Sequence, residues 1–455
     1  MSIAKQRRED RAVFMRFVDE QVLAAVSAGA TGFAAILSSL PSIYPTELLA
    51  AVDRLARDRV ITPSLAETIS NEATHTAANR PEGRSLLPLP HPLDFEWRFS
   101  PDASRDLLNL ATELTPPNGD VLLFGTPGLA VEALSLPTNR HLSFLADDNV
   151  VTQRLIALNQ ATGSPLSIAF CSAGLPRTSA DAVLVDPPWY MDFIRPMLEA
   201  AATACRAGGF VLISLPPSGT RPSAEADQAA TLRFAARLGL DLLDHQPLAV
   251  AYDTPFFETN ALAAAGIQAL PRWRRGDLMV LRKSRSTART PRPLSGRRRC
   301  WVEASVGRMR LFIKSGTGIV TGYEGLTPLI DGDVLPSVSR RDARRRHAQV
   351  WTSGNRVFRT DNPILVLEAA LSYNGESVGP GVQPRLWGNL RELEALKRVG
   401  RKLAALAELE ANEEGGLQTI APERSLRWTS SSTRFCSTLA ATISGSPTCA
   451  TPPIP

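Results

Sequence analysis

The chain has few of the side chains that bind transition metals. It carries 5 histidines and 5 cysteines among 455 residues, and both kinds are widely dispersed. No two cysteines form a C-x-x-C pair, so the spacing of a zinc site is absent, and we predict that no metal is bound. The odd number of scattered cysteines argues against a disulfide framework and favours a reducing cytoplasm. The cysteines are Cys171, Cys205, Cys300, Cys436 and Cys449.

A long hydrophobic run is missing as well. The stretch 21–40 carries no charge and follows a basic N-terminus, but it is rich in Ala, Ser and Gly, with Gly29 and Gly32 at its centre. Asp19 and Glu20 directly precede it. A membrane-spanning helix needs a more apolar sequence. We therefore expect two short helices that break near the glycines, and no membrane contact.

Aromatic residues are sparse at 6%, whereas 44% of the chain is hydrophobic and 21% is charged, as in globular proteins. The length predicts two or three domains. The net charge of +5 is unevenly distributed, because residues 285–359 contain 16 Lys/Arg and only 5 Asp/Glu. We expect an anionic partner, nucleic acid first, to bind this basic region. A merely solvated surface is an equal alternative.

Residues 1–85 are predicted to form a helical module. Apolar residues recur at helical spacing from Val13 onward, and Pro45 with Glu47 marks the start of another helix. Helices, a proline turn and the β-branched pair Val60-Ile61 follow the order of a winged helix-turn-helix. A packing module fits the same order, and the balanced charges of this part give poor support for DNA binding.

Residues 86–284 are predicted to form an α/β domain around a doubly wound sheet. The Pro-rich segment 86–99 ends in aromatic residues and is expected to pack against this domain, over its pocket. From Gly119 onward, apolar strand segments alternate with helical segments, which is the pattern of a parallel sheet with helices on both faces. Seven strands are expected, with cores at 121–124, 141–145, 167–170, 182–185, 210–214, 248–252 and 278–281.

The fourth of these strands ends in the sequence Asp186-Pro187-Pro188-Trp189. Two prolines stop the strand because they have no N–H to donate, and they hold the backbone in a stiff turn. The Asp186 carboxylate and the Pro187 carbonyl can accept hydrogen bonds, and aromatic rings follow at once. This combination suits a planar or basic amine that donates hydrogen bonds and stacks. A proline-rich turn without a function is the plainer alternative.

A glycine turn after strand one, acids after strand two and Asp-Pro-Pro-Trp after strand four resemble a class I S-adenosylmethionine-dependent methyltransferase over residues 100–284. The fourth-strand motif is similar to that of the amino-methyltransferases, which include the N6-adenine enzymes. The resemblance implies a seven-stranded Rossmann-like enzyme that uses S-adenosylmethionine as cofactor. Its first expected acceptor is the N6 amine of adenine in nucleic acid, and a protein lysine is the alternative.

The resemblance implies a cofactor site at the first two strands. Phe124, Gly125 and Gly128 would lie against the methionine part of the cofactor. Asp147 or Asp148, about 20 residues beyond the glycine turn, would hold its ribose. The sequence of the turn departs from the usual G-x-G-x-G and contains a proline, which removes one N–H. This departure keeps open a third possibility, a nucleic-acid-binding regulator with a degenerate methyltransferase fold.

The resemblance implies a catalytic turn formed by Asp186, Pro187, Pro188 and Trp189. The carboxylate and the first proline carbonyl would orient the lone pair of the amine, and Trp189 or Tyr190 would stack on the acceptor. Tyr252 and Phe256 would contact the substrate from a rim, or would instead fill the sheet edge. The layout is also similar to that of the branched-polyamine aminopropyltransferases. The acidic run of that family at the glycine loop is absent, which disfavours a polycation.

The composition changes after residue 284. A basic linker is predicted at 285–300 and a small basic β-rich region at 301–385, which begins with a hairpin. An amphipathic helix is expected at 386–414, and the Ser/Thr/Pro-rich tail at 415–455 is expected to be disordered. The sequence does not indicate an oligomeric state.

Overall fold

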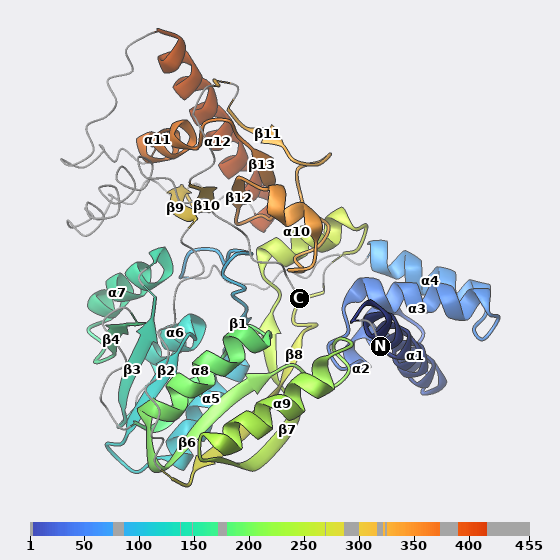
Figure 1. Ribbon diagram of the computed structural model, residues 1–455, viewed down its shortest axis with the longest axis vertical. Coiled ribbons are helices and arrows are strands. Elements are labelled where there is room, and N and C mark those ends of the chain that lie inside the picture. The colour runs from blue at the N-terminus through green and yellow to red at the C-terminus, as the bar shows by residue number, and fades with distance from the viewer. Residues whose placement is uncertain are drawn as a thin grey trace. The chain divides into compact units, whose positions relative to one another are not determined.

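The computed structural model describes residues 3–75, 86–136, 138–147, 149–171, 180–268, 270–285, 300–315, 322–323, 325–373 and 390–415. Its contacts divide the chain into two compact units (Figure 1). The first, here called the sheet unit, comprises Met1–Leu87, Phe95–Pro255 and Ala265–Ser295. The C-terminal unit comprises Pro88–Asp94, Phe256–Ala264 and Gly296–Pro455. The division differs from the predicted 86–284 domain, because two short segments of that range belong to the C-terminal unit.

Four helices begin the sheet unit, as the predicted helical module requires. They are α1 (Ile3–Ser27), α2 (Phe33–Ser39), α3 (Pro45–Arg57) and α4 (Pro63–His75). The module is tied to the sheet by Ser42, whose hydroxyl donates to the Arg275 carbonyl at 2.6 Å and accepts from the Arg275 N–H at 2.7 Å. Val60 and Ile61 lie in a bend, and residues 3–75 contain no strand. The winged helix therefore stays a prediction.

The core of the sheet unit is one mixed sheet of eight strands. They run in the order β4-β3-β2-β5-β6-β8-β7-β1. Strands β2 to β6 pair in parallel, whereas β8 is antiparallel to both β6 and β7, and the short β1 is antiparallel to β7. The bounds are β1 (Arg98–Phe99), β2 (Asp120–Phe124), β3 (His141–Ala146), β4 (Ser167–Phe170), β5 (Ala180–Val185), β6 (Cys205–Leu215), β7 (Leu240–Asp253) and β8 (Arg275–Lys283).

Helices cover both faces of this sheet (Figure 1). Buried side chains of α5 (Pro101–Leu114), α6 (Pro127–Ser135) and α7 (Val150–Thr162) pack on one face. Those of α8 (Met191–Ala204) and α9 (Ala224–Arg237) pack on the other. The predicted doubly wound, Rossmann-like α/β fold is confirmed, but the sheet has eight strands and not the seven predicted, because the short β1 pairs with the edge of β7. Helix α7 is not predicted from the sequence, although Asn149 caps it by accepting a hydrogen bond from the Thr152 N–H at 2.9 Å.

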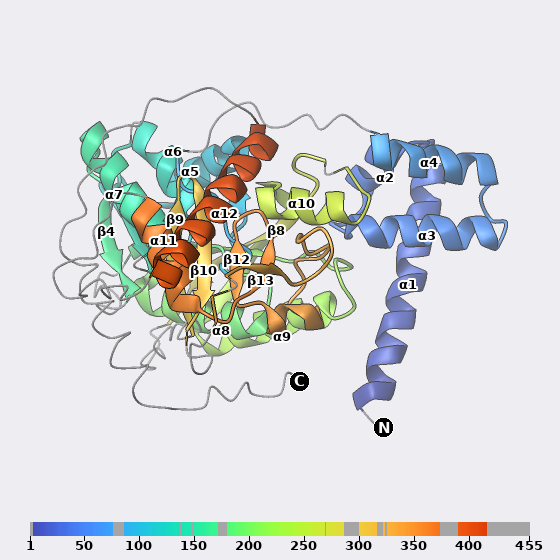
Figure 2. The same ribbon diagram turned by 90° about the horizontal axis from the view of Figure 1, so that it is seen from above.

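The C-terminal unit contains a five-stranded antiparallel sheet in the order β11-β13-β12-β10-β9. Helix α12 packs beside α11, and both contact the β9–β10 hairpin (Figure 2). The β-rich region predicted from the sequence is thus confirmed. The elements are α10 (Phe256–Ala264), β9 (Trp301–Val306), β10 (Met309–Lys314), β11 (Thr327–Pro328), a 3-10 helix (Ala343–His347), β12 (Val350–Thr352), β13 (Val357–Arg359), α11 (Pro363–Tyr373) and α12 (Leu390–Gly415).

None of the helices in the described ranges combines the length and the apolar character that a bilayer span requires. The predicted linker falls almost entirely within 286–299, and the predicted tail within 416–455. Both ranges lie outside the described residues.

Candidate active site

The strand register brings the predicted motifs to one edge of the sheet. Phe124 at the end of β2 pairs with Val185 at the end of β5, and Val185 pairs with Ile213 on β6. The next residue along each of these strands is therefore Gly125, Asp186 or Ser214. Because β2, β5 and β6 are parallel neighbours, these three residues lie side by side at the carboxyl edge, where ligands bind in doubly wound folds.

Asp186 follows a strand whose six residues are all buried. The turn closes at once, because the Tyr190 N–H donates to the Pro188 carbonyl at 2.6 Å, and α8 begins at Met191. Asp186 itself is partly exposed. Within the described residues, no hydrogen bond is made by the Pro187 carbonyl or by the Asp186 Oδ2 atom. Asp186 Oδ2 thus lies on a partly exposed residue without a hydrogen bond to the described part of the chain, whereas Pro187 is buried.

Tyr252 on β7 holds the other oxygen of Asp186. Its hydroxyl donates to Asp186 Oδ1 at 2.7 Å and lies 2.6 Å from the Ser214 hydroxyl. Burial raises the pKa of Asp186 to about 7, although the Tyr252 hydrogen bond and the positive charge of Arg274 each lower it. Burial and the neighbouring Asp186 charge raise the pKa of Tyr252 well above its usual value, so its phenol stays neutral. Ser214 and Arg274 are not predicted from the sequence as site residues.

The Tyr252 ring is 2% exposed and lies in an aromatic cluster. Its centroid is 5.0 Å from that of Phe99, 5.7 Å from that of Trp189 and 6.3 Å from that of Trp97. The ring thus fills the sheet edge, which is one of the two alternatives, and the hydroxyl reaches the candidate catalytic carboxylate. The predicted contact with a substrate stays a prediction.

Trp189 is largely buried, whereas a ring that stacks on an acceptor must have an accessible face. Its side chain is only 5% exposed, and the Arg274 guanidinium lies over its ring. Tyr190 is partly exposed, with the Phe95 ring edge-on at 5.6 Å and the Arg221 guanidinium 5.8 Å from its ring centre. Of the two aromatic residues proposed to stack on an acceptor, Tyr190 therefore offers the more accessible ring. The stacking role itself stays a prediction.

Of the segment 86–99 that is predicted to pack over the pocket, residues 95–99 lie against this edge, whereas Pro88–Asp94 belong to the C-terminal unit. Phe95 contacts Tyr190 and Phe193, whereas Trp97 and Phe99 contact Tyr252. Phe95 adopts φ +53°, which is unfavourable for a bulky residue. Such strain persists only where the surroundings impose it, and it is frequent at functional sites.

The glycine turn lies beside Asp186. Gly125 has φ +67°, a conformation that favours glycine, and a Cβ atom there would lie 3.0 Å from Met197. A Cβ on Gly128 would lie 3.3 Å from Arg98. Phe124 is buried at the end of β2, and its backbone leads directly into this turn. The space that a Cβ would need at these two glycines is thus occupied by the Met197 and Arg98 side chains.

Thr126 is a candidate cofactor-binding residue that the sequence did not reveal. It occupies the N-cap position of α6 but makes no capping bond, and its hydroxyl is buried without any hydrogen-bond partner among the described residues. The first intrahelical bond runs from the Ala130 N–H to the Thr126 carbonyl, which leaves the N–H groups of Gly128 and Leu129 unpaired by the helix. Unpaired donors at a helix N-terminus suit an anion such as a carboxylate.

Asp147 follows β3, next to β2 in the sheet, and its side chain is exposed. Its backbone carbonyl accepts a hydrogen bond from the Thr152 hydroxyl at 2.8 Å, which fixes the start of α7 beside it. Asp148, the other candidate for the ribose contact, lies outside the described residues. The turn thus offers N–H groups that the helix leaves unpaired, and Asp147 offers a carboxylate at the end of the neighbouring strand; their contacts with a cofactor stay predictions.

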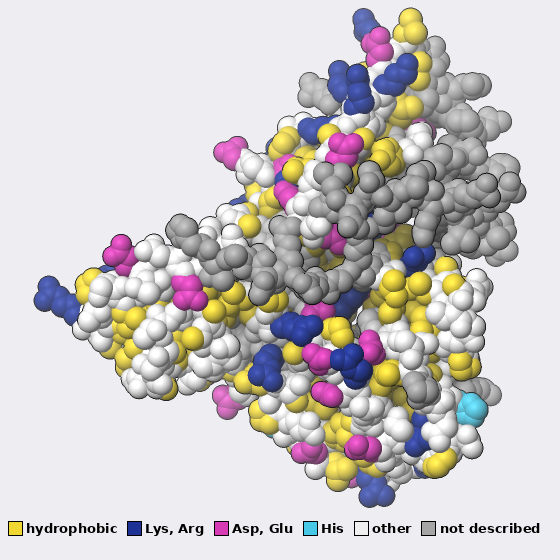
Figure 3. Space-filling model, turned by 180° about the vertical axis from the view of Figure 1, so that it is seen from behind, with side chains coloured by type: hydrophobic (Ala, Val, Ile, Leu, Met, Phe, Trp, Pro, Cys, Tyr) yellow, Lys and Arg dark blue, Asp and Glu magenta, His cyan; other side chains and the backbone are white. Residues whose placement is uncertain are grey.

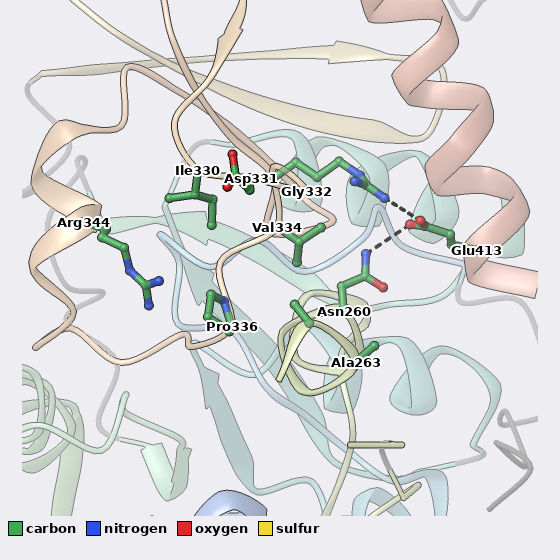
Figure 4. Close-up of a pocket in the computed structure, with 11 residues that line it drawn as sticks. Asn260, Ala263, Ile330, Asp331, Gly332, Val334, Pro336, Arg344 and Glu413 are labelled. Carbon is green, nitrogen blue, oxygen red and sulfur yellow. Dashed lines mark hydrogen bonds and ion pairs between the residues drawn. The ribbon is translucent and has the colours of Figure 1, made fainter. Parts of the chain in front are cut away.

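Phe256 is the first residue of α10 and belongs to the C-terminal unit, so its predicted substrate contact remains untested. Within the described residues, no group of three or more His, Cys, Asp or Glu side chains is placed to hold a metal ion. The C-terminal unit also contains a pocket of its own, of about 600 Å³ (Figure 4). Its charged residues are largely satisfied internally, since Arg356 pairs with Glu413, and Glu413 accepts from Asn260 at 3.2 Å.

The strand order and the antiparallel β8 define a Rossmann-like fold of the methyltransferase type. Protein-family models and curated proteins were searched, and neither comparison found a match. Among solved structures, the chain is similar to a branched-chain polyamine synthase from Thermus thermophilus, in complex with N4-aminopropylspermidine and 5'-methylthioadenosine. The two are 14% identical over 61% of this chain and 90% of that one, with a TM-score of 0.43.

Two methyltransferase-fold structures are further examples. TrmN from Thermus thermophilus is 19% identical over 40% of this chain and 48% of its own, with a TM-score of 0.29. A methyltransferase from Pyrococcus furiosus is 15% identical over 39% of this chain and 82% of its own, with a TM-score of 0.29. The assignment of the fold rests on the strand order of this chain, and nothing about its activity is taken from these likenesses.

Proposed function

We propose that this chain is an S-adenosylmethionine-dependent N-methyltransferase. One observation carries the proposal: the glycine turn and Asp186 directly follow the paired residues Phe124 and Val185 on adjacent parallel strands. A donor held at the turn and an amine held at Asp186 would therefore meet at the same edge. Transfer by in-line displacement needs alignment of the reacting atoms above all, and these two fixed turns supply it.

The donor, when bound, would supply a methyl group on positively charged sulfur. Thr126 and the free N–H groups of α6 would bind its carboxylate, and Asp147 would accept hydrogen bonds from its ribose. The glycine turn lacks acidic residues and ends at a helix N-terminus, which favours a donor that still carries its carboxylate. This preference supports methyl transfer over aminopropyl transfer, for which the donor is decarboxylated.

The acceptor would donate an N–H to Asp186 Oδ2 or to the Pro187 carbonyl. We propose the N6 amine of adenine in nucleic acid as the first acceptor, with Tyr190 stacking on the base. Stacking on an aromatic side chain contributes about 1–3 kcal/mol per base and tolerates any sequence. A carboxylate with a pKa near neutrality can also take a proton from an aliphatic ammonium. That property favours a lysine side chain as the second candidate acceptor.

The basic region 285–359 is the proposed nucleic-acid contact. Part of its charge is neutralised within the C-terminal unit, because Arg310 pairs with Asp94 and Glu303, and Arg356 is buried among acids. On the face shown in Figure 3, Lys and Arg side chains stand in small groups interspersed with Asp and Glu. Among the described residues, Arg341 and Arg346 are exposed and could contact phosphates.

The proposal is tested with methyl-labelled S-adenosylmethionine and three acceptors: adenine-containing nucleic acid, a lysine peptide and spermidine. We expect label in one macromolecular fraction and S-adenosylhomocysteine as the second product. Asp186→Asn should abolish transfer while donor affinity, measured by calorimetry, stays within about threefold, because the carboxylate contacts the acceptor. Asp241→Asn, an exposed acid on β7, is the matched control.

Two outcomes would redirect the proposal. Formation of methylthioadenosine from a decarboxylated donor would assign aminopropyl transfer instead. Salt-sensitive nucleic-acid binding without donor binding or turnover, unchanged in Asp186→Asn, would assign a regulator with a degenerate methyltransferase fold. A protein that binds no donor of either kind would refute the enzyme proposal altogether.

A further inference from the structure

Three side chains from different strands form one line of hydrogen bonds that ends at Asp186. The carboxylate can only accept, so the single phenolic proton of Tyr252 points to Asp186 Oδ1 across 2.7 Å. With its proton used, the Tyr252 oxygen must accept from Ser214, whose hydroxyl lies 2.6 Å away. The hydroxyl protons of Ser214 and Tyr252 therefore both point toward the carboxylate, which stabilises its charged form.

The line is rigid. Ser214 and Tyr252 are each 2% exposed, and Phe99, Trp97 and Trp189 pack around the phenol. The backbone on the neighbouring strand leaves room for the Ser214 hydroxyl only because residue 276 is glycine, since a Cβ there would lie 2.4 Å from Ser214 Oγ. The hydrogen bond from Tyr252 thus holds Asp186 Oδ1 in place, while Oδ2 makes no hydrogen bond to any described residue.

We propose that Ser214 and Tyr252 are positioning residues that keep Asp186 ionised, with Oδ2 directed at the acceptor amine, so that Asp186 takes up the proton released by the transfer. This inference rests on the proposed function. The amine nitrogen forms a bond to the carbon carried by the sulfonium donor. The carbon–sulfur bond breaks, and its electron pair stays on sulfur as a neutral thioether. The resulting ammonium then gives one N–H proton to Oδ2.

The ionisable groups that face Asp186 are Tyr252 on β7 and Arg274 just before β8. The Tyr252 N–H also bonds to the Arg274 carbonyl at 3.0 Å, so the two are held together by backbone. The hydroxyl of Tyr252 and the charge of Arg274 both lower the pKa of Asp186, against the dominant effect of burial. Removing the hydroxyl should therefore raise this pKa and leave a smaller fraction of the base form at neutral pH.

The test is the pH dependence of kcat/KM, which reports groups of the free enzyme. The wild type should lose activity as the pH falls below the pKa of Asp186. Tyr252→Phe should move this acid limb upward by about one pH unit, with a roughly fivefold loss at pH 7 that approaches about tenfold at lower pH and is largely recovered at high pH. Ser214→Ala should move it the same way by less. Tyr373→Phe, an exposed tyrosine in the C-terminal unit, should change nothing.

An equal loss at every pH in Tyr252→Phe, with the acid limb in place, would show a purely structural role and overturn the inference. The proposed function fails separately, if the wild type neither binds donor nor forms product. In that case, measurements of protein stability still test whether Ser214 and Tyr252 act on Asp186. The pH at which Asp186 titrates, obtained from unfolding free energies with and without Asp186→Asn, should rise in the Ser214→Ala and Tyr252→Phe backgrounds. If this pH is unchanged in both backgrounds, the inference is overturned.

Discussion

The guanidinium carbon of Arg274 lies 4.0 Å from the centre of the Trp189 ring, and the Trp97 ring contacts the same guanidinium at 4.4 Å. The cation thus lies against two indoles, an arrangement whose attraction strengthens as water is excluded. Trp189 is held by this contact and by Tyr252, which makes it part of the wall of the site. Its neighbour Tyr190 is left as the more accessible aromatic surface of the turn.

Changes at Trp189 and Tyr190 should therefore have different effects. Trp189→Leu should lower the free energy of unfolding by about 2–4 kcal/mol, because it removes a buried ring. Tyr190→Ala should change stability little and raise the KM of an adenine acceptor about tenfold, through lost stacking. Denaturant unfolding and steady-state kinetics measure the two effects. Tyr190→Phe keeps the ring and should keep the KM, and an unchanged KM in Tyr190→Ala would argue against stacking there.

Thr126→Val tests the donor site. Valine has the same shape without the hydroxyl, so the change should raise the Kd of S-adenosylmethionine about tenfold to a hundredfold, from one lost hydrogen bond to a charged group. Stability without donor should stay equal or increase, since the buried hydroxyl has no partner among the described residues. Thr231→Val is the control, because that buried hydroxyl donates to the Asp227 carbonyl at 2.8 Å. The control should lose stability and keep its donor affinity.

Asp186 should make the stability of the sheet unit depend on pH. Burial raises its folded pKa to about 7, above the ordinary value of 3.8. The folded state then binds the proton more tightly, so its stabilising effect is complete below about pH 4 and is lost as the pH rises toward 7. A pKa difference of about three units corresponds to a change of at most about 4 kcal/mol in the free energy of unfolding, and to less where water reaches the carboxylate. Asp186→Asn should flatten this dependence, as measured by urea unfolding between pH 4 and 8.

Much of the sheet unit could be predicted from the sequence because its signals are local. A buried run that stops at Asp186-Pro187-Pro188 marks a strand end wherever the strand lies in the sheet. The parallel order of such strands then places Gly125 and Asp186 at one edge. Helix α7 was missed although it has a capping asparagine, because its apolar residues form no clear stripe.

The contacts of the site could not be predicted, since they depend on the register of distant strands. Tyr252 and Asp186 are 66 residues apart, and the pairing of β7 with β8 contains register shifts that the sequence does not reveal. The sequence likewise suggested an open ring at Trp189, but it cannot show that Arg274 covers that ring. Ser214 gave one usable signal, as a polar residue at the end of a buried strand.

Glu410 on α12 is another acid whose pKa is raised, and it lies in the C-terminal unit with a side chain that is 1% exposed. It accepts hydrogen bonds from the Thr352 and Ser353 hydroxyls, and the Arg356 Nε lies 4.0 Å from it. A Cβ on Gly354 would lie 2.4 Å from the Glu410 carboxyl, so this loop closes tightly over the acid. Burial raises the pKa of Glu410 to about 7, against the lowering effects of these hydroxyls and of Arg356.

The docking of α12 should therefore weaken as the pH rises. The folded pKa of Glu410 exceeds its ordinary value of 4.5, so the stabilisation is complete below about pH 4.5 and is lost on the way to pH 7. The stabilisation lost between these pH values is at most about 3 kcal/mol. Amide hydrogen exchange along α12, corrected for intrinsic rates, should show less protection at pH 7.5 than at pH 5.5. Glu410→Gln, which is always neutral, should remove the difference, whereas Glu408→Gln on the exposed face of the helix should leave it. Equal protection at both pH values in the wild type would mean that the surrounding hydroxyls and Arg356 keep Glu410 charged at no cost to the fold.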